Sequence, residues 1–201
     1  MDQQSKKSAR AAVREARKNL PDTVRTERAG QISTHVREYL AALTPVVRSV
    51  ALYNSQPDEP DTETLMRQLF DDGINIYLPV CEPEYQLSWV RWEPGIELER
   101  SPRAPVMEPV GQRFGVELFE AEDGISTLFI PALSIDSNGY RLGQGGGYYD
   151  RFLPRIAHTP VQVAAMVFDE EFVPAGSYEL NEYDTAVDLV ITPAGVHHII
   201  D

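Results

Sequence analysis

Hydrophobic residues recur along this chain with two periods, one helical and one extended. Apolar positions spaced by three and four predict helices, and short apolar runs between polar turns predict buried strands. The predicted helices cover residues 5–18, 21–43, 61–72 and 148–157. The predicted strands cover residues 46–53, 74–80, 86–92, 126–130, 161–168 and 186–192. Because strands and helices alternate along the chain, we expect an α/β, Rossmann-like fold with a mostly parallel sheet and helices on both faces.

Two polar loops follow strands of this predicted sheet. Residues 53–59 come after the first strand, and residues 141–147 come after the strand over 126–130. Ligands of such sheets bind beyond the carboxyl ends of the strands, so we expect both loops to meet at one cleft. Four prolines fall within residues 94–115, which predicts a long loop with little regular structure.

Composition is that of an ordinary globular chain. Its 201 residues are 42% apolar and 24% charged, which predicts one domain over residues 1–201. No apolar run reaches about 18 residues and the first residues are polar, so we expect no membrane span and no signal peptide. The single cysteine suits a reducing compartment. We therefore expect a cytoplasmic protein, and a monomer.

Charge is distributed unevenly. The whole chain carries −13, which disfavours binding to nucleic acid or to anionic membranes. Residues 1–18 nevertheless hold six basic and two acidic residues, including every lysine of the chain. In the predicted helix over 5–18, Ala9, Ala12, Val13 and Ala16 form an apolar stripe, and Lys6, Arg10 and Arg14 form a basic stripe with a spacing of four. This basic helix either folds over an anionic ligand or presents a solvated face.

A glycine-rich segment carries the clearest chemical signal. Gly143, Gly145, Gly146 and Gly147 fall within five positions, just before a predicted helix. Bare backbone N–H groups at a helix N-terminus form an anion site, and Arg141 and Asp150 flank it. The segment matches neither the Gly-Lys-Ser/Thr ending of a Walker loop nor a Gly-x-Gly-x-x-Gly dinucleotide motif. Phosphate binding and a flexible surface turn therefore both remain open on this motif alone.

Residues 138–153, read with their neighbours, resemble the signature of the 5-formyltetrahydrofolate cyclo-ligases, also called methenyltetrahydrofolate synthetases. The likeness extends over nearly the whole chain, in the family's order. It includes Lys6 and Arg10, residues 53–59, residues 128–131 with Asp136, and residues 181–184 before 187–190. The resemblance implies that ATP drives conversion of 5-formyltetrahydrofolate to 5,10-methenyltetrahydrofolate, with release of ADP and phosphate. It implies ATP as co-substrate, Mg²⁺ as cofactor, and a folate substrate with or without a polyglutamate tail.

The resemblance also implies roles for single residues. Catalytic roles fall to Lys6, Arg141 and Tyr149. Contacts with ATP fall to Lys6, Arg10, Arg141, Leu142, Gly143, Gln144, Gly145, Gly146, Gly147, Tyr148 and Tyr149. Contacts with the folate fall to Asn54, Glu59, Gln144 and Tyr148. Mg²⁺ would be held by Asp150 and Asp184. Gln144 and Gly146 occupy positions where some family members have basic side chains, so the loop itself brings less positive charge here.

Each of these residues also has a purely structural interpretation. Asp150 would interact favourably with a helix dipole, Glu59 would be solvated in an acidic loop, and Tyr148 and Tyr149 would pack a helix onto the sheet. Two other function classes share the glycine segment. One is a Rossmann-like isomerase or transferase acting on a sugar phosphate, which needs no cationic first helix. The other is a folate or nucleotide sensor that binds without turnover.

Overall fold

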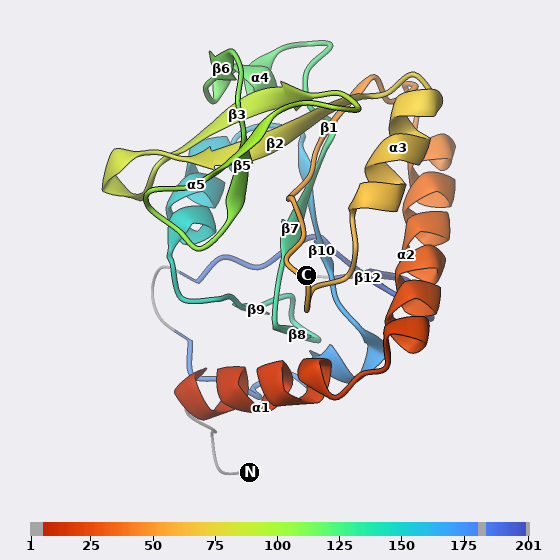
Figure 1. Ribbon diagram of the computed structural model, residues 1–201, viewed down its shortest axis with the longest axis vertical. Helices are drawn as coiled ribbons and strands as arrows, with labels where there is room; N and C mark the ends of the chain where they lie inside the picture. The colour runs from red at the N-terminus through yellow and green to blue at the C-terminus, as the bar shows by residue number, and fades with distance from the viewer. Residues whose placement is uncertain (1–5, 181–183, 200–201) are drawn as a thin grey trace.

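The computed structural model describes residues 6–180 and 184–199, and its centre is an eight-stranded sheet with the order β13-β12-β10-β7-β1-β2-β3-β6 (Figure 1). These strands are β1 (Ser49–Ala51), β2 (Asn75–Cys81), β3 (Leu87–Trp92), β6 (Arg113–Phe114), β7 (Thr127–Pro131), β10 (Gln162–Met166), β12 (Leu189–Thr192) and β13 (Gly195–His198). The five strands from β12 to β2 pair in parallel, whereas β13, β3 and β6 extend the sheet by antiparallel pairs. The predicted mostly parallel α/β sheet is confirmed.

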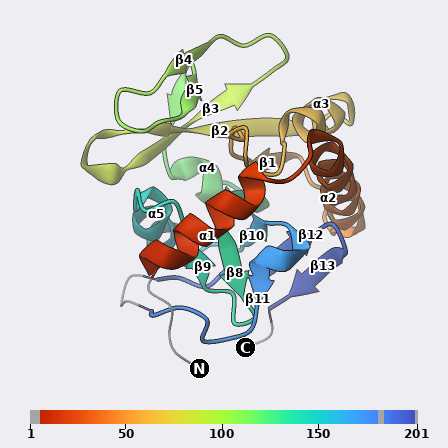
Figure 2. The ribbon, with the colours of Figure 1, turned by 60° about the horizontal axis from the view of Figure 1, so that its bottom comes forward.

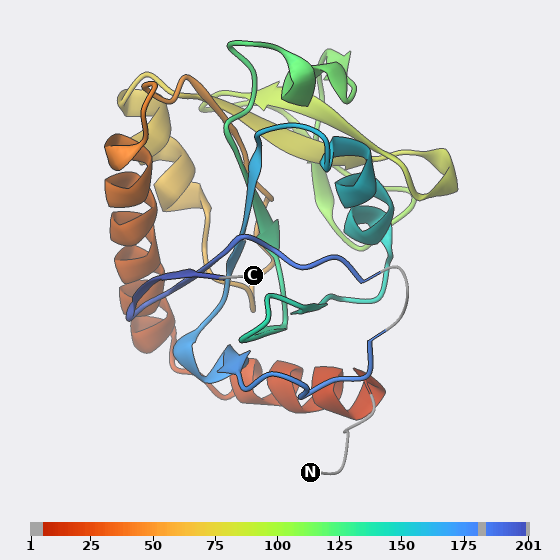
Figure 3. The ribbon, with the colours of Figure 1, turned by 180° about the vertical axis from the view of Figure 1, so that it is seen from behind.

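Helices cover both faces of the sheet, as predicted. The helices α2 (Asp22–Ala42) and α3 (Glu63–Asp71) lie on one face, and α4 (Glu117–Glu120) and α5 (Tyr148–Ile156) lie on the other (Figures 1 and 3). Strand β1 shows why two apolar layers form: Val50 belongs to the core under α2 and α3, and Ala51 belongs to the core under α5. Successive side chains of a strand point to opposite faces, so a strand buried on both faces is apolar throughout.

Helix α1 (Lys6–Lys18) covers neither face. It crosses the end of the sheet beside a small three-stranded sheet of β11 (Phe172–Val173), β8 (Ser134–Asp136) and β9 (Arg141–Leu142) (Figure 2). Its apolar contact is small, because Ala9 and the half-buried Val13 are the α1 residues in the cluster with Leu133, Leu142 and Tyr178. Ala12 and Ala16 are exposed, so the predicted apolar stripe is only half used.

Two sequence predictions about connections are wrong. The proline-rich stretch 94–115 contains β4 (Leu98–Arg100) paired with β5 (Met107–Pro109), followed by β6. These strands are two or three residues long and lie at sheet edges, where a proline without an N–H is tolerated. The glycine segment does not follow β7 directly either, because the β8–β9 hairpin comes between them. No described helix combines the length and the apolarity needed to cross a membrane.

Candidate active site

A pocket of about 700 Å³ opens beyond the carboxyl ends of β1, β2 and β7. Four segments supply most of its lining: α1, the loop after β1, the glycine segment, and residues 103–107 from the β4–β5 connection. The two loops that the sequence predicts at one cleft therefore do meet, although the second reaches it through β8 and β9. Residues from position 6 to position 184 contribute, so the pocket is assembled from nearly the whole chain.

The glycine segment has a backbone shape that requires glycine at two places. Gly145 has a φ of 101°, and Gly147, the residue before α5, has a φ of 72°. Residues with a side chain adopt such angles only at a cost, so these glycines hold the turn that brings the start of α5 to the pocket. The first turn of α5 exposes backbone N–H groups and the positive end of the helix dipole, which favours an anion.

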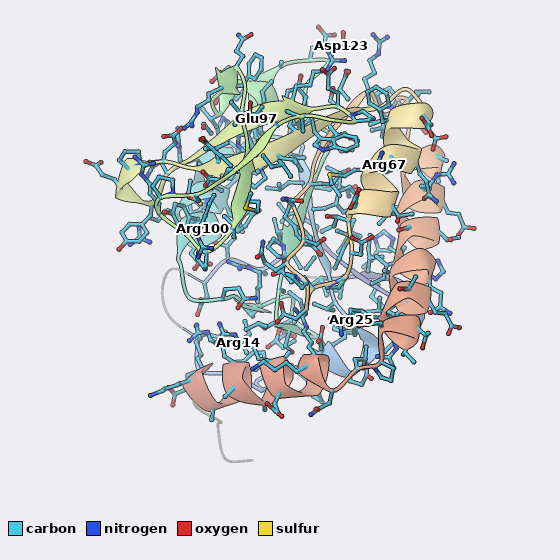
Figure 4. The ribbon with its side chains drawn as sticks, viewed as in Figure 1. Arg14, Arg25, Arg67, Glu97, Arg100 and Asp123 are labelled. Carbon is cyan, nitrogen blue, oxygen red and sulfur yellow. The ribbon has the colours of Figure 1, made fainter. Side chains whose placement is uncertain are left out.

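The basic stripe of α1 faces this segment across the pocket. Lys6, Arg10 and Arg14 all line the pocket. Arg10 donates from Nε to the carbonyl oxygen of Gly143 at 2.9 Å, and Arg14 donates from Nη2 to Oε1 of Gln144 at 2.7 Å. Figure 4 shows Arg14 on the side of α1 that faces the rest of the molecule. The positive charge that the loop lacks is therefore supplied by the helix.

Among the residues that line the pocket, two ion pairs each join a cation to a carboxylate. Lys6 Nζ lies 2.5 Å from Oδ2 of Asp184, and Arg141 Nη2 lies 2.5 Å from Oδ1 of Asp150. Over residues 6–180 and 184–199, no three or more His, Cys, Asp or Glu side chains form a group suited to a metal. Mg²⁺ is commonly held by one or two carboxylates together with substrate phosphates. The two aspartates therefore do not form a metal site by themselves, and an ion at either one would need phosphate oxygens as further ligands.

Glu59, in the loop after β1, is only 5% exposed. Its carboxylate accepts hydrogen bonds from the Gln56 backbone N–H at 2.9 Å and from Nε2 of Gln144 at 3.3 Å. Burial raises the pKa of this carboxyl group above its ordinary value, because the charged form loses its hydration. The solvated-loop interpretation of Glu59 is therefore wrong. Asn54 lies beside it and donates from Nδ2 to the Met107 carbonyl oxygen at 3.2 Å.

The two tyrosines after the glycines both line the pocket. The Tyr149 hydroxyl is buried and has no hydrogen-bond partner among the described residues, and burial raises the pKa of this hydroxyl, so it remains a proton donor. The Arg141 guanidinium lies 5.6 Å from the centre of the Tyr149 ring. Tyr148 packs its ring 5.7 Å from that of Tyr85. Leu142, in contrast, is fully buried and points its side chain into the core.

Several pocket residues were missed from the sequence as site candidates. Arg14 continues the spacing of Lys6 and Arg10, so the periodicity of the first helix was sufficient to find it. Tyr85 and Arg103 come from segments without a local signal, and only the fold brings them to the pocket. The family-like segment 181–184 is placed only at Asp184, because residues 181–183 lie outside the described residues.

Known proteins resemble this chain over nearly its whole length. The model of the 5-formyltetrahydrofolate cyclo-ligase family matches residues 2–193. The 5-formyltetrahydrofolate cyclo-ligase of Mycolicibacterium smegmatis is 30% identical over 198 residues, which covers 96% of each chain. The enzyme of the same name from Escherichia coli is 30% identical over 188 residues, covering 92% of this chain and 98% of the relative.

Solved structures give the same fold. The 5,10-methenyltetrahydrofolate synthetase of Aquifex aeolicus superposes with a TM-score of 0.72 at 27% identity, covering 98% of this chain and 93% of that one. The 5,10-methenyltetrahydrofolate synthetase of Mycoplasma pneumoniae has a TM-score of 0.73 at 18% identity, covering 96% and 99% of the two chains. At that lower identity the second likeness concerns the fold alone.

Proposed function

The chain belongs to the 5-formyltetrahydrofolate cyclo-ligase family, and we propose that it uses ATP to convert 5-formyltetrahydrofolate to 5,10-methenyltetrahydrofolate. One observation carries the proposal beyond family membership. The basic stripe of α1 and the glycine segment face each other across one end of a pocket, and Glu59 and Asn54 line the same pocket. That arrangement suits a triphosphate and an organic substrate held together.

The reaction needs activation of a poor leaving group. The N-formyl oxygen attacks the γ-phosphorus of ATP, an O–P bond forms, and ADP leaves. The N10 nitrogen then attacks the activated formyl carbon, loses its proton and closes the ring as phosphate departs. Phosphoryl transfer depends on positioning and on neutralising charge, so it requires no covalent protein nucleophile.

The chain supplies these functions through its cations and its backbone. Lys6, Arg10 and Arg141 would bind the phosphates, together with the N–H groups of residues 143–147. Lys6 and Arg141 would neutralise charge that develops on the transferred group. Tyr149, with its buried unpartnered hydroxyl, would donate a hydrogen bond to the reacting oxygen or to a phosphate.

The two ion pairs of the pocket suggest how the site responds to a triphosphate. Lys6 is paired with Asp184 and Arg141 with Asp150. A phosphate would attract both cations, and Mg²⁺ would bind beside the phosphate and the two carboxylates. The ion, when bound, neutralises phosphate charge and keeps several of its waters.

The folate would lie beside the loop after β1. Asn54, Glu59, Gln144 and Tyr148 are the residues we assign to it. Gln144 contacts residues of both groups, because it accepts a hydrogen bond from Arg14 of α1 and donates one to Glu59. It therefore connects the proposed phosphate side with the proposed folate side.

The decisive experiment is an absorbance assay. Incubation with 5-formyltetrahydrofolate, Mg²⁺ and ATP should produce the methenyl chromophore together with one ADP per product. The matched control omits ATP. Absence of the chromophore with ATP present would reject the proposal in favour of binding without turnover, and equal rates without ATP would reject the ATP-driven mechanism. One domain over residues 1–201, a monomeric state and a cytoplasmic location stay predictions.

A further inference from the structure

The basic stripe of α1 has a fourth member that does not reach the pocket. Arg17 follows Arg14 by three residues, so it lies on the same side of the helix. Lys6, Arg10 and Arg14 line the pocket, whereas Arg17 is 2% exposed and is absent from the pocket lining. A buried arginine at the end of a mostly solvated helix requires a structural explanation, because an unpaired buried charge is costly.

Arg17 is bound by two separate segments of the protein body. Its Nε and Nη2 donate to the two carboxylate oxygens of Glu171 at 2.6 and 2.8 Å, which is the bidentate geometry. Its Nη2 also donates to the Ala132 carbonyl oxygen at 2.7 Å. Glu171 is itself held in place, because its Oε2 accepts the Phe168 backbone N–H at 2.9 Å. The guanidinium therefore has a fixed position.

The other contacts of α1 with the body are weak by comparison. Its apolar contribution is Ala9 and the half-buried Val13. Lys6, Arg10 and Arg14 also make polar contacts, and these involve groups at the pocket itself. The Arg17 pair is thus the one strong attachment that we find, among the described contacts of α1, outside the region where a ligand would bind.

The segment that holds Ala132, one of the partners of Arg17, leads directly to the pocket. Ala132 immediately follows Pro131, which ends β7 and lines the pocket. The chain then continues through β8 and β9, and β9 carries Arg141. Arg17 therefore links α1 to the same strand end from which the glycine segment is reached.

We propose that Arg17 is a positioning residue for the triphosphate, an inference that rests on the proposed function. Its buried pair with Glu171 sets the angle at which α1 presents Lys6, Arg10 and Arg14 to the glycine segment. A helix rises about 1.5 Å per residue, so Lys6 lies roughly 16 Å along the axis from Arg17. A tilt of roughly 10° at Arg17 would therefore displace Lys6 by about 3 Å. A misplacement of about 1 Å is sufficient to reduce catalysis by about 100-fold.

The test compares Arg17→Met with Arg28→Ala. Arg28 is a close match, since its guanidinium also lies 5.7 Å from the Phe168 ring and pairs with Glu170, the residue before Glu171. Arg28 belongs to α2 and pairs at the surface. Arg17→Met should raise the KM for ATP at least ~10-fold, raise it more than the KM for 5-formyltetrahydrofolate, and speed hydrogen exchange over α1. Arg28→Ala should change neither KM by more than ~2-fold.

A second variant separates positioning from stability. Arg17→Met leaves Glu171 buried and unpaired, so the protein could simply unfold. The double variant Arg17→Met/Glu171→Met removes both charges and should recover part of the melting temperature that Arg17→Met loses. We expect its KM for ATP to stay raised, because the bond to the Ala132 carbonyl is also gone. A double variant with wild-type stability and a wild-type KM for ATP would overturn the inference.

The same experiment distinguishes this inference from the proposed function. A wild-type protein that turns over without ATP would reject the proposed function. ATP-dependent wild-type turnover together with an unchanged KM for ATP in Arg17→Met would reject the role of Arg17 alone. Hydrogen exchange over α1 in the absence of ATP reports the attachment of the helix whether or not the protein is active.

Discussion

Substitution of Gly145 by valine tests whether the glycine segment binds the triphosphate. The φ of Gly145 is 101°, and a Cβ added there would lie 3.8 Å from Cζ of Arg10. That distance is an ordinary contact, so the first added carbon fits and the penalty comes from the backbone. A β-branched residue in such a conformation costs about 1–3 kcal/mol, which the loop would relieve by changing its shape.

The expected loss of binding follows from the contacts of the segment. A changed loop would lose the hydrogen bond from Arg10 to the Gly143 carbonyl oxygen and would turn its N–H groups away from the pocket. A hydrogen bond to a charged group contributes about 1.5–3 kcal/mol. At about 1.4 kcal/mol per factor of ten, the affinity for ATP should fall about 10- to 100-fold. The Glu59 side should retain part of its affinity for the folate.

Gly95→Val is the matched control for this substitution. Gly95 has a φ of 88°, nothing lies within 4 Å of its added Cβ, and it does not line the pocket. Both variants should lose stability through the same backbone strain, about 2–4 °C of melting temperature for each kcal/mol in a chain of this size. Calorimetric titrations with ATP and with 5-formyltetrahydrofolate separate the two sides. Wild-type ATP affinity in Gly145→Val would refute the assignment of this segment to the triphosphate.

Three further substitutions address the charges of the pocket. Lys6→Ala should raise the KM for ATP about 10-fold or more, while the circular dichroism spectrum stays native. The control is Lys7→Ala, because Lys7 is exposed. Equal ATP kinetics in the two variants would remove Lys6 from the phosphate site. Asp150→Asn should shift the Mg²⁺ titration of turnover to higher concentration and should cost about 1 kcal/mol of stability. An unchanged Mg²⁺ titration would leave Asp150 only its structural pair with Arg141. Glu59→Gln should weaken folate binding. Because burial raises the folded pKa of Glu59 above 4.5, wild-type stability falls as pH rises from that value through the folded pKa, and denaturation series should show a shallower fall in Glu59→Gln.

Local patterns predicted the elements of this fold well. The first helix is predicted over 5–18 and observed over Lys6–Lys18, and most strands agree to within a few residues. The antiparallel arrangement of β2 and β3 was missed, although only residues 82–86 separate them. Such a short connection cannot carry a crossover, so it requires an antiparallel pair. The short edge strands β4, β5 and β6 had no periodicity to reveal them.

The sequence identified many residues of the site, but it did not reveal which residues they contact. Resemblance to the family brought out Lys6, Asp150 and Glu59, and all three line the observed pocket. Their partners were not visible, because Lys6 and Asp184 are 178 positions apart, and Arg17 and Glu171 are 154 apart. From one sequence, a charged residue on a helix stripe looks the same whether it is solvated or buried against such a partner.

The attachment of α1 has a consequence for the order in which this protein acquires its structure during synthesis. Helix α1 is made before its anchor, because Glu171 is translated 154 residues after Arg17. At roughly 5–20 residues per second, the ribosome needs on the order of 10–30 s to produce the partner. During that interval the basic helix has an acidic, incomplete nascent chain beside it and no buried carboxylate to accept Arg17. A chain interrupted before Glu171 would therefore contain most of the sheet and lack the anchored helix.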